Sequence, residues 1–390
     1  MAQYRQVFSC VARYNLRHVE LSWHSQNRLS IEIRTKGRNG MDGAAWPQVR
    51  GDLLSTRWGA AAFLNNLETA CTTISRTEWV VRWLNIGDAH CVLGDTNKEK
   101  GYFDEVAEDW LCALTAFEVA RRLACEDASK IEVVSAKINV VIQKLGKLGP
   151  KVERVQIECC DQFEISAHFL PARDRSSAAP AIICISTEAE TATTLLGRLL
   201  PVVMHRGMSV LVVAHDDLSD TGRSQSDLFL SCCVDYLSTR SDVDAARIGV
   251  YGDGLSAALA TDLAAFDSRV AAAVCDGGLW NLARMLASVG WLTRTADVQD
   301  EQVISARRLR LLRQLRCPVL VVAGGRGIIS AAEAMKLLVD GAAAPIDLQL
   351  AIPRMLTIDG EEFENFVTAD DRIFGWLEHK LVRNTLSNQS

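Results

Sequence analysis

The sequence predicts an α/β fold: a mostly parallel, twisted sheet with helices on both faces, preceded by a helical N-terminal region. After about residue 150, short and almost continuously apolar segments alternate with helical patterns, which is typical of a parallel sheet covered on both faces. Before residue 150, apolar residues recur mainly at the helical period. The chain has 390 residues, enough for one large domain and a smaller appendage.

Helical patterns dominate residues 1–150, which we assign to a cap or accessory region. We expect helices over residues 58–74, 79–93, 105–124 and 131–145. Within the third of these, Val106, Trp110 and Leu114 recur at four-residue steps and form an apolar stripe. Residues 19–23 and 28–34 alternate between polar and apolar side chains, which predicts two short strands.

Residues 151–390 follow a Gly/Pro break at 144–151 and are assigned to the α/β core. The segments VERVQIEC and FEISAHFL flank a short polar turn and predict a hairpin. Strands are then expected over residues 181–186, 209–215, 247–251, 270–276, 317–324 and 346–352, each followed by a helical stretch. The final helix carries Ile373, Trp376 and Leu377 on one face, so we expect it to pack on the sheet.

The charge and apolar patterns argue against nucleic-acid and membrane partners. The formal net charge is −6, and acidic and basic residues are interspersed, so no basic footprint for nucleic acid exists. The first 20 residues contain no apolar core of signal-peptide length, and no stretch approaches the roughly 20 apolar residues of a membrane span. We therefore expect a cytoplasmic protein.

The 12 cysteines are scattered and show no C-x-x-C spacing. This distribution favours buried, reduced thiols over a zinc site, so we expect no metal. Neither GDGLS nor AGGRG matches the glycine patterns that bind nucleotides. We therefore expect no cofactor.

The segment RIGVYGDGLSAAL, residues 247–259, reads as a buried strand, a sharp turn and a helix of small residues. Hydrolases with this arrangement place their nucleophile at the tip of the turn, flanked by small residues that permit a tight backbone approach. The tip here is Gly254. Ligands of parallel sheets bind outside the carboxyl ends of the strands, which lie here near Ser186, His215 and Asp276.

The elbow region, SDVDAARIGVYGDGLSAALATDLAAFDSRVAAAVCDGG, resembles that of the FrsA-like α/β-hydrolases, which include the 2,6-dihydroxypseudooxynicotine hydrolase type and fungal polyketide-shortening relatives. The resemblance extends through HRGMSVLVVAHDD and RCPVLVVAGGRG, and GYFDEVAEDWLCALTAFEVARRLA resembles the family's helical cap. It covers most of residues 75–385 and leaves residues 1–70 unassigned. It implies an α/β-hydrolase fold with a helical N-terminal cap, and cleavage beside a carbonyl by Ser, Asp and His.

All three triad positions are substituted when the family motif is carried onto this sequence. The nucleophile position falls on Gly254, and the acid position falls on Gly327 in GGRG. The base belongs within residues 352–363, near Leu356, where no histidine occurs. The family's Gly-rich oxyanion loop is replaced by STEAET, whose carboxylates would repel a developing oxyanion. The structural alternative is a capping box formed by Thr187 and Glu190.

Ser256 is an alternative nucleophile, because a two-residue slip gives a second G-x-S-x-small pattern. A serine hydroxyl needs a base within hydrogen-bond reach. The only histidine that follows Ser256 is His379 in the final helix, and His215 lies on a different strand end. We therefore expect Ser256 to bond the local backbone in the first helical turn.

Other polar residues at the strand ends have both a chemical and a structural interpretation. His215 and Asp217 are either an acid/base pair or a loop anchor with a helix cap. Asp276 is either an alternative acid or part of an Asp-Gly turn. The candidates for substrate binding are Ser186, Thr187, Asp253, Leu255 and Arg326. Arg326 would bind a carboxylate, and Asp253 is expected to bond the backbone of the elbow.

These observations favour a degenerate, non-hydrolytic member of the fold. It would keep a cap–core pocket for a small carbonyl-containing or aromatic metabolite, as a homodimer or in a heteromer with an active hydrolase. The first alternative is a lyase, decarboxylase or cyclase of secondary metabolism that uses acid/base groups, with His215 foremost. The second is an active hydrolase with Ser256 as a displaced nucleophile. A purely structural partner would have a filled pocket.

Overall fold

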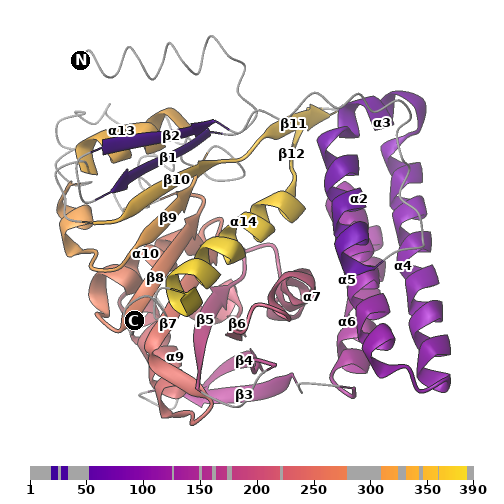
Figure 1. The fold of residues 1–390 in the computed structure, drawn as a ribbon, viewed down its shortest axis with the longest axis horizontal. Helices are drawn as coiled ribbons and strands as arrows, with labels where there is room; N and C mark the ends of the chain where they lie inside the picture. The colour runs from indigo at the N-terminus through magenta and orange to yellow at the C-terminus, as the bar shows by residue number, and fades with distance from the viewer. Residues whose placement is uncertain are drawn as a thin grey trace.

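A ten-stranded sheet forms the centre of the molecule (Figure 1). The computed structural model describes residues 52–124, 127–148, 152–159, 164–173, 178–219, 223–278, 309–323, 331–341, 346–358 and 360–383, together with strands β1 (Val19–His24) and β2 (Arg28–Ile33). The strand order across the sheet is β2-β1-β10-β9-β8-β7-β5-β6-β4-β3.

The six central strands run parallel, as the apolar segments predicted. They are β5 (Ala179–Ile185), β6 (Ser209–Val213), β7 (Val243–Asp253), β8 (Val270–Asp276), β9 (Val319–Val322) and β10 (Leu348–Ile352). Every residue of β5, β6 and β9 is buried. Burial on both faces is what a continuous apolar strand requires.

The predicted hairpin is confirmed at one edge of the sheet. Strands β3 (Glu153–Glu158) and β4 (Glu164–Leu170) pair antiparallel, and β4 then pairs antiparallel with β6. At the opposite edge β1 pairs antiparallel with both β2 and β10. Strands β1 and β2 therefore extend the core sheet, which corrects the assignment of their residues to the helical region. The remaining division near residue 150 stays a prediction.

The helical region contains five helices within the described residues: α2 (Leu53–Asn65), α3 (Leu67–Thr73), α4 (Arg76–Glu99), α5 (Phe103–Ala124) and α6 (Ala128–Leu145). The side chains of Asp52, Ser75 and Asp127 accept hydrogen bonds at the starts of α2, α4 and α6. The expected helix over residues 58–74 is divided at Asn66 into α2 and α3. Figure 1 shows these helices standing beside the sheet.

Helix α5 is the buried centre of this region, and two glycines of α4 allow it to lie close. A Cβ atom on Gly87 would lie 2.3 Å from the ring of Phe117, and one on Gly94 would lie 2.4 Å from the ring of Trp110. Both aromatic side chains are fully buried. Trp79 and Trp83 are buried in the same core, whereas Trp58, Tyr102 and Phe103 are exposed.

Two apolar cores cover the two faces of the sheet. Within the described residues, the remaining α-helices are α7 (Ala192–Val203), α8 (His215–Ser219), α9 (Arg223–Thr239), α10 (Ser256–Phe266), α13 (Ala331–Gly341) and α14 (Phe366–Glu378). Helices α7 and α14 pack on the face that also carries α2–α6, whereas α9, α10 and α13 pack on the other face. The expected packing of the last helix is confirmed by buried Ile373 and Leu377.

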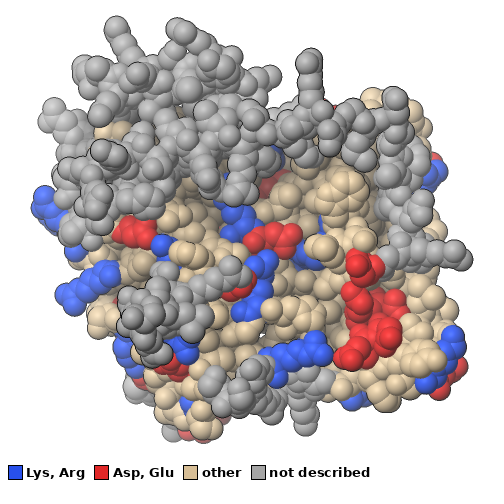
Figure 2. Space-filling model, viewed as in Figure 1, with Lys and Arg blue, Asp and Glu red and all other residues tan. Residues whose placement is uncertain are grey.

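Beyond these elements, a short hairpin joins β11 (Met355–Ile358) to β12 (Glu361–Glu364), and a π-helical turn, η2 (His379–Arg383), follows α14. None of the helices in the described part of the chain combines the length and apolar character needed to cross a bilayer. On the face in Figure 2, basic side chains are scattered and form no broad area, and several acidic side chains lie together on the right side of the view.

Candidate functional site

The turn between β7 and α10 has the geometry of a nucleophile elbow. Gly254 occupies its tip with φ +62°, in the left-handed region that glycine adopts at no steric cost. A Cβ atom on Gly252 would lie 2.1 Å from the carbonyl oxygen of Ser256, so only glycine fits at that position. The backbone N–H of Gly254 donates to the carbonyl oxygen of Asp276, 2.7 Å away. The elbow is therefore tight, and its tip carries no side chain.

The loop after β5 lies over this tip. A Cβ atom on Gly254 would lie 3.4 Å from Oε2 of Glu188 and 3.5 Å from Cγ2 of Thr187. These are ordinary contact distances, so the space above the tip would accept a small side chain. Thr187 is buried, whereas Gly254 and Leu255 are half-buried and Glu188 is exposed. The tip is therefore partly open to solvent, and the exposed carboxylate of Glu188 lies beside it.

Ser256 is fully buried and its hydroxyl is engaged twice. Its Oγ atom donates to the carbonyl oxygen of Ser186, 2.5 Å away, and lies 2.7 Å from Nδ1 of His215. Because a hydroxyl has one proton and a carbonyl can only accept, Nδ1 of His215 must donate to Ser256. The neutral imidazole then carries its lone pair on Nε2.

This contact overturns one expectation from the sequence, namely that no histidine lies within reach of Ser256. It also differs from the expected bond to the local backbone, since the acceptor is the end of β5, 70 residues earlier. The direction of the bonds matters for chemistry. In this arrangement the Ser256 hydroxyl donates to a backbone carbonyl and accepts from His215, so both bonds hold the fold together.

Ser186, a predicted substrate-binding residue, also has its hydroxyl inside the fold. Its Oγ atom lies 2.8 Å from the carbonyl oxygen of Glu190 and 3.0 Å from that of Thr187, and it accepts from the N–H of His215 at 3.1 Å. The residue is fully buried. These bonds hold the ends of β5 and β6 together.

The predicted capping box of Thr187 and Glu190 is wrong. Helix α7 begins after Thr191, whose side chain accepts from the N–H of Thr194 at 3.1 Å. Thr191 has a hydroxyl placed to satisfy one of the first helical N–H groups, as an N-cap residue does. The backbone of Glu190 closes a turn onto the carbonyl oxygen of Thr187, and its carboxylate is used elsewhere.

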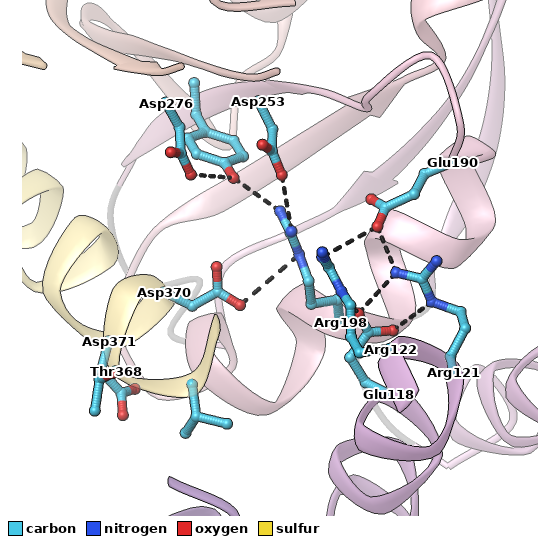
Figure 3. Close-up of polar contacts among 12 residues, drawn as sticks. Glu118, Arg121, Arg122, Glu190, Arg198, Asp253, Asp276, Thr368, Asp370 and Asp371 are labelled. Atoms are coloured by element: carbon cyan, nitrogen blue, oxygen red, sulfur yellow. Dashed lines mark hydrogen bonds and ion pairs between the residues drawn. The ribbon is translucent and has the colours of Figure 1, made fainter. Parts of the chain in front are cut away.

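That carboxylate belongs to a buried ion-pair cluster between α5 and the core (Figure 3). Glu190 binds Arg121 closely and lies 3.2 Å from Nη2 of Arg122, and both arginines bind Glu118 at 2.7 Å. Burial alone would raise the pKa of Glu190, but Arg121 and Arg198 outweigh it and hold this pKa at about 2. Glu190 therefore carries a fixed negative charge.

Arg198 of α7 is the centre of a second buried group beneath the elbow (Figure 3). Its Nη1 atom lies 2.8 Å from Oδ2 of Asp253, and its Nη2 atom lies 2.8 Å from the hydroxyl of Tyr251. Its Nε atom faces Oδ2 of Asp370 at 3.7 Å. The carboxylate of Asp253, expected to bond the elbow backbone, is therefore ion-paired with a helix on the cap side of the sheet.

Among the described residues around Arg198, carboxyl groups outnumber cations. Burial favours the neutral forms of these carboxyl groups. Burial, with Asp253 and Glu364 nearby, raises the pKa of Asp276 well above its usual range. Burial also raises the pKa of Asp370 to about 7, against the opposing effect of Arg198. Asp276 receives a long hydrogen bond of 3.4 Å from Tyr251, and its backbone supports the elbow. The glycines that follow it have positive φ angles, as an Asp-Gly turn requires.

The structure places the other predicted positions as follows. Gly327 and Arg326 lie outside the described residues. Leu356 is in β11 with its side chain buried in the core that includes the cap helices. Asp217 is an exposed residue of α8. Within the described ranges, no group of three or more His, Cys, Asp or Glu side chains is arranged to hold a metal ion.

A small pocket lies at the carboxyl ends of β9 and β10, beside the first half of α14. It is lined by Val322, Ala351, Pro353, Arg354, Asn365, Thr368, Ala369, Arg372 and Ile373. This lining does not include Gly254, Ser256 or His215. The pocket and the elbow are therefore separate features, both at the carboxyl ends of the parallel strands.

Sequence reasoning missed Arg198 and Asp370, because both lie in helices whose apolar residues dominate the pattern. A charged residue at an inward position of such a helix is the available signal, since buried charges are paired. It also missed Glu188 as a residue facing the tip. The segment STEAET is acidic, but a loop pattern does not determine side-chain directions.

No family model matches the sequence. Two uncharacterized proteins of Mycobacterium tuberculosis, MT2364 of strain CDC 1551 / Oshkosh and Rv2307c of strain ATCC 25618 / H37Rv, are 28% identical over 202 residues, 50% of this chain and 69% of each relative. The solved structure of 2,6-dihydroxy-pseudo-oxynicotine hydrolase superposes with a TM-score of 0.55 at 16% identity and covers 83% of this chain and 96% of its own. The chain thus has the α/β-hydrolase fold.

Proposed function

We propose that this protein is a degenerate α/β-hydrolase-fold protein that forms no acyl-enzyme and binds a small carbonyl-containing or aromatic metabolite over its elbow. The observation that carries the proposal is Gly254 at the tip of the turn with φ +62° and no side chain. Nucleophilic catalysis needs a hydroxyl, thiol or carboxylate at that point. A turn that keeps the elbow geometry but lacks a nucleophile supports a site that binds a ligand without forming a covalent intermediate.

The nearest hydroxyl supports the same conclusion. Ser256 is fully buried, and its proton is donated to a backbone carbonyl. To attack a substrate it would have to break that bond and leave the core. The expected displaced-nucleophile mechanism therefore requires a rearrangement of the first turn of α10, which is itself packed against β7 and β8.

The ion pairs beneath the elbow support a fixed binding surface. Arg198 and the pair Arg121 and Arg122 join the cap helices, α7 and the elbow through buried carboxylates. Breaking such a pair leaves an uncompensated buried charge, which costs about 3–5 kcal/mol. The cap and core are thus held in one arrangement around the tip. Association with a second copy or an active hydrolase remains part of the proposal.

Labelling with a fluorophosphonate probe, together with turnover of a panel of p-nitrophenyl esters, tests the absence of a nucleophile. We expect no labelling and no ester turnover by the wild-type protein, while an active serine esterase in the same assay reacts. The Ser256→Ala variant is the matched control. Labelling of the wild type that disappears in this variant would show that Ser256 is a nucleophile and would refute the proposal.

The binding part is tested by mass spectrometry of small molecules that copurify with the native protein. We expect an aromatic or carbonyl-containing metabolite, and we expect its addition to raise the melting temperature. A filled site with no copurifying or stabilising small molecule would favour a structural partner instead.

A second candidate function is non-hydrolytic acid/base catalysis, as in a lyase, decarboxylase or cyclase. The bond from His215 to Ser256 favours it, because it fixes the imidazole and leaves Nε2 as the basic nitrogen. With the copurified compound as substrate, His215→Gln is expected to abolish turnover. Unchanged turnover in this variant would remove the assignment and leave binding as the function.

A further inference from the structure

The carboxylate of Glu188 faces the vacated tip of the elbow. Its Oε2 atom lies 3.4 Å from the position that a Cβ atom on Gly254 would occupy. The side chain is exposed, and within the described part of the chain no hydrogen bond or ion pair engages its carboxylate. Among the described residues, the partly exposed tip of the elbow therefore has one unpaired negative charge beside it.

The position of this charge reverses the usual polarity of the site. In acyl-transfer enzymes of this fold, the corresponding loop contributes an N–H donor to a developing negative oxygen. Here the same loop presents an acceptor. We infer that the elbow accepts a ligand that offers a cationic or hydrogen-bond-donating group, such as a primary ammonium, and that Glu188 binds this group. The inference rests on the proposed ligand-binding function and names its chemical class.

Among the described residues, the buried arginines beneath the elbow do not neutralise Glu188. Arg198 is engaged by Asp253, and Arg121 and Arg122 are engaged by Glu118 and Glu190. Buried arginines held in this way are not available to an exposed loop side chain. No cation in the part of the chain that the structure describes thus pairs with Glu188, and its charge is available to a ligand.

The start of helix α10 would instead favour an anionic ligand. Helix α10 begins at Ser256, and the N–H groups at a helix start attract anions. Under that alternative, Glu188 is an internal anion that rests against the helix start, and its removal would open an anion site. The two accounts predict opposite responses to the same substitution.

Benzylamine, benzyl alcohol and benzoate are similar in shape and differ in charge, so they distinguish these two accounts. Each is titrated at pH 7 with the full-length protein and followed by ligand-observed NMR. We expect benzylamine to bind at least about tenfold more tightly than benzoate, as a charge-assisted hydrogen bond predicts. Glu188→Gln is expected to weaken benzylamine binding about tenfold. Glu158→Gln, an exposed residue at the end of β3, is the matched control and should change nothing.

Each other outcome refutes the inference in a distinct way. Unchanged benzylamine affinity in Glu188→Gln with a gain in benzoate affinity would identify Glu188 as the internal anion. Equal binding of all three probes would leave the proposed binding function standing and remove its cationic specificity. Binding of none of them would count against both. Glu188→Asp, which keeps the charge, should retain the preference for benzylamine and so controls for a folding defect.

Discussion

Nδ1 of His215 lies 2.7 Å from Oγ of Ser256, and the same oxygen lies 2.5 Å from the carbonyl oxygen of Ser186. These two bonds join the ends of β5 and β6 to the start of α10. In an α/β sheet this edge is where ligands bind. The hydroxyl that the sequence offers as an alternative nucleophile is thus used to hold that edge together.

Ser256→Ala should destabilise the protein, because it leaves a buried carbonyl without a donor and the His215 N–H without an acceptor. We expect the free energy of unfolding to fall by about 1–3 kcal/mol in urea titrations. Ser166→Ala is the control, since Ser166 is exposed on β4 and should change stability by less than about 0.5 kcal/mol. Equal losses in the two variants would contradict the structural role of Ser256.

The fold was predictable from the sequence because each strand and helix carries its own periodicity. Strands such as β5 are apolar throughout, and the last helix places Ile373 and Leu377 on one face. The position of β1 beside β10 was not predictable, because pairing between segments more than 300 residues apart depends on tertiary contacts. The helical pattern around it gave no indication of a shared sheet.

The site was predictable only where backbone geometry determines it. Gly252 and Gly254 predict a tight turn, and the structure contains one. Side-chain partners were not predictable, because they join separate elements. Thr187 and Glu190 matched the capping-box spacing, yet Thr191 is the N-cap residue and Glu190 pairs with arginines of α5.

The two elbow glycines should differ in what they tolerate. Gly254→Ala has room for its Cβ atom and should lose only the cost of a positive φ angle, about 1–2 kcal/mol. Gly252→Ala places a Cβ atom 2.1 Å from a backbone oxygen and should lose about 3 kcal/mol or more. Gly207→Ala is the matched control, with φ +65° and open space around it. In chemical denaturation, the free energy of unfolding of Gly252→Ala should be well below those of Gly254→Ala and Gly207→Ala.

Arg198→Met should be among the most destabilising single substitutions outside the apolar core. It leaves Asp253 and Asp370 buried without their cation, and we expect a loss of about 3–5 kcal/mol in the free energy of unfolding. Lys130→Met removes an exposed ion pair with Asp127 and should cost less than about 0.5 kcal/mol. If Arg198→Met were as mild as Lys130→Met, the buried ion pairs would not hold the elbow in place.

The raised pKa of Asp370 predicts that stability falls as the pH rises. Burial lifts this pKa to about 7, so between its ordinary value near 4 and about pH 7 the folded protein keeps a proton that the unfolded chain has lost. The stabilisation is complete below pH 4 and is lost as the pH rises toward 7. For one such group the slope reaches about 1.4 kcal/mol per pH unit.

Urea denaturation at pH 5, 6, 7 and 8 measures this slope directly. Asp370→Asn removes the titrating group and should flatten the profile, with its stability relative to the wild type improving from pH 5 to pH 8. Asp371→Asn, at the more exposed neighbouring position of α14, is the matched control and should leave the slope in place. Because burial raises the pKa of Asp276 in the same direction, part of the slope should persist in Asp370→Asn. An unchanged slope in that variant would show that Asp370 is ionised in the folded protein at pH 5, and the proton would then belong to another carboxyl group around Arg198.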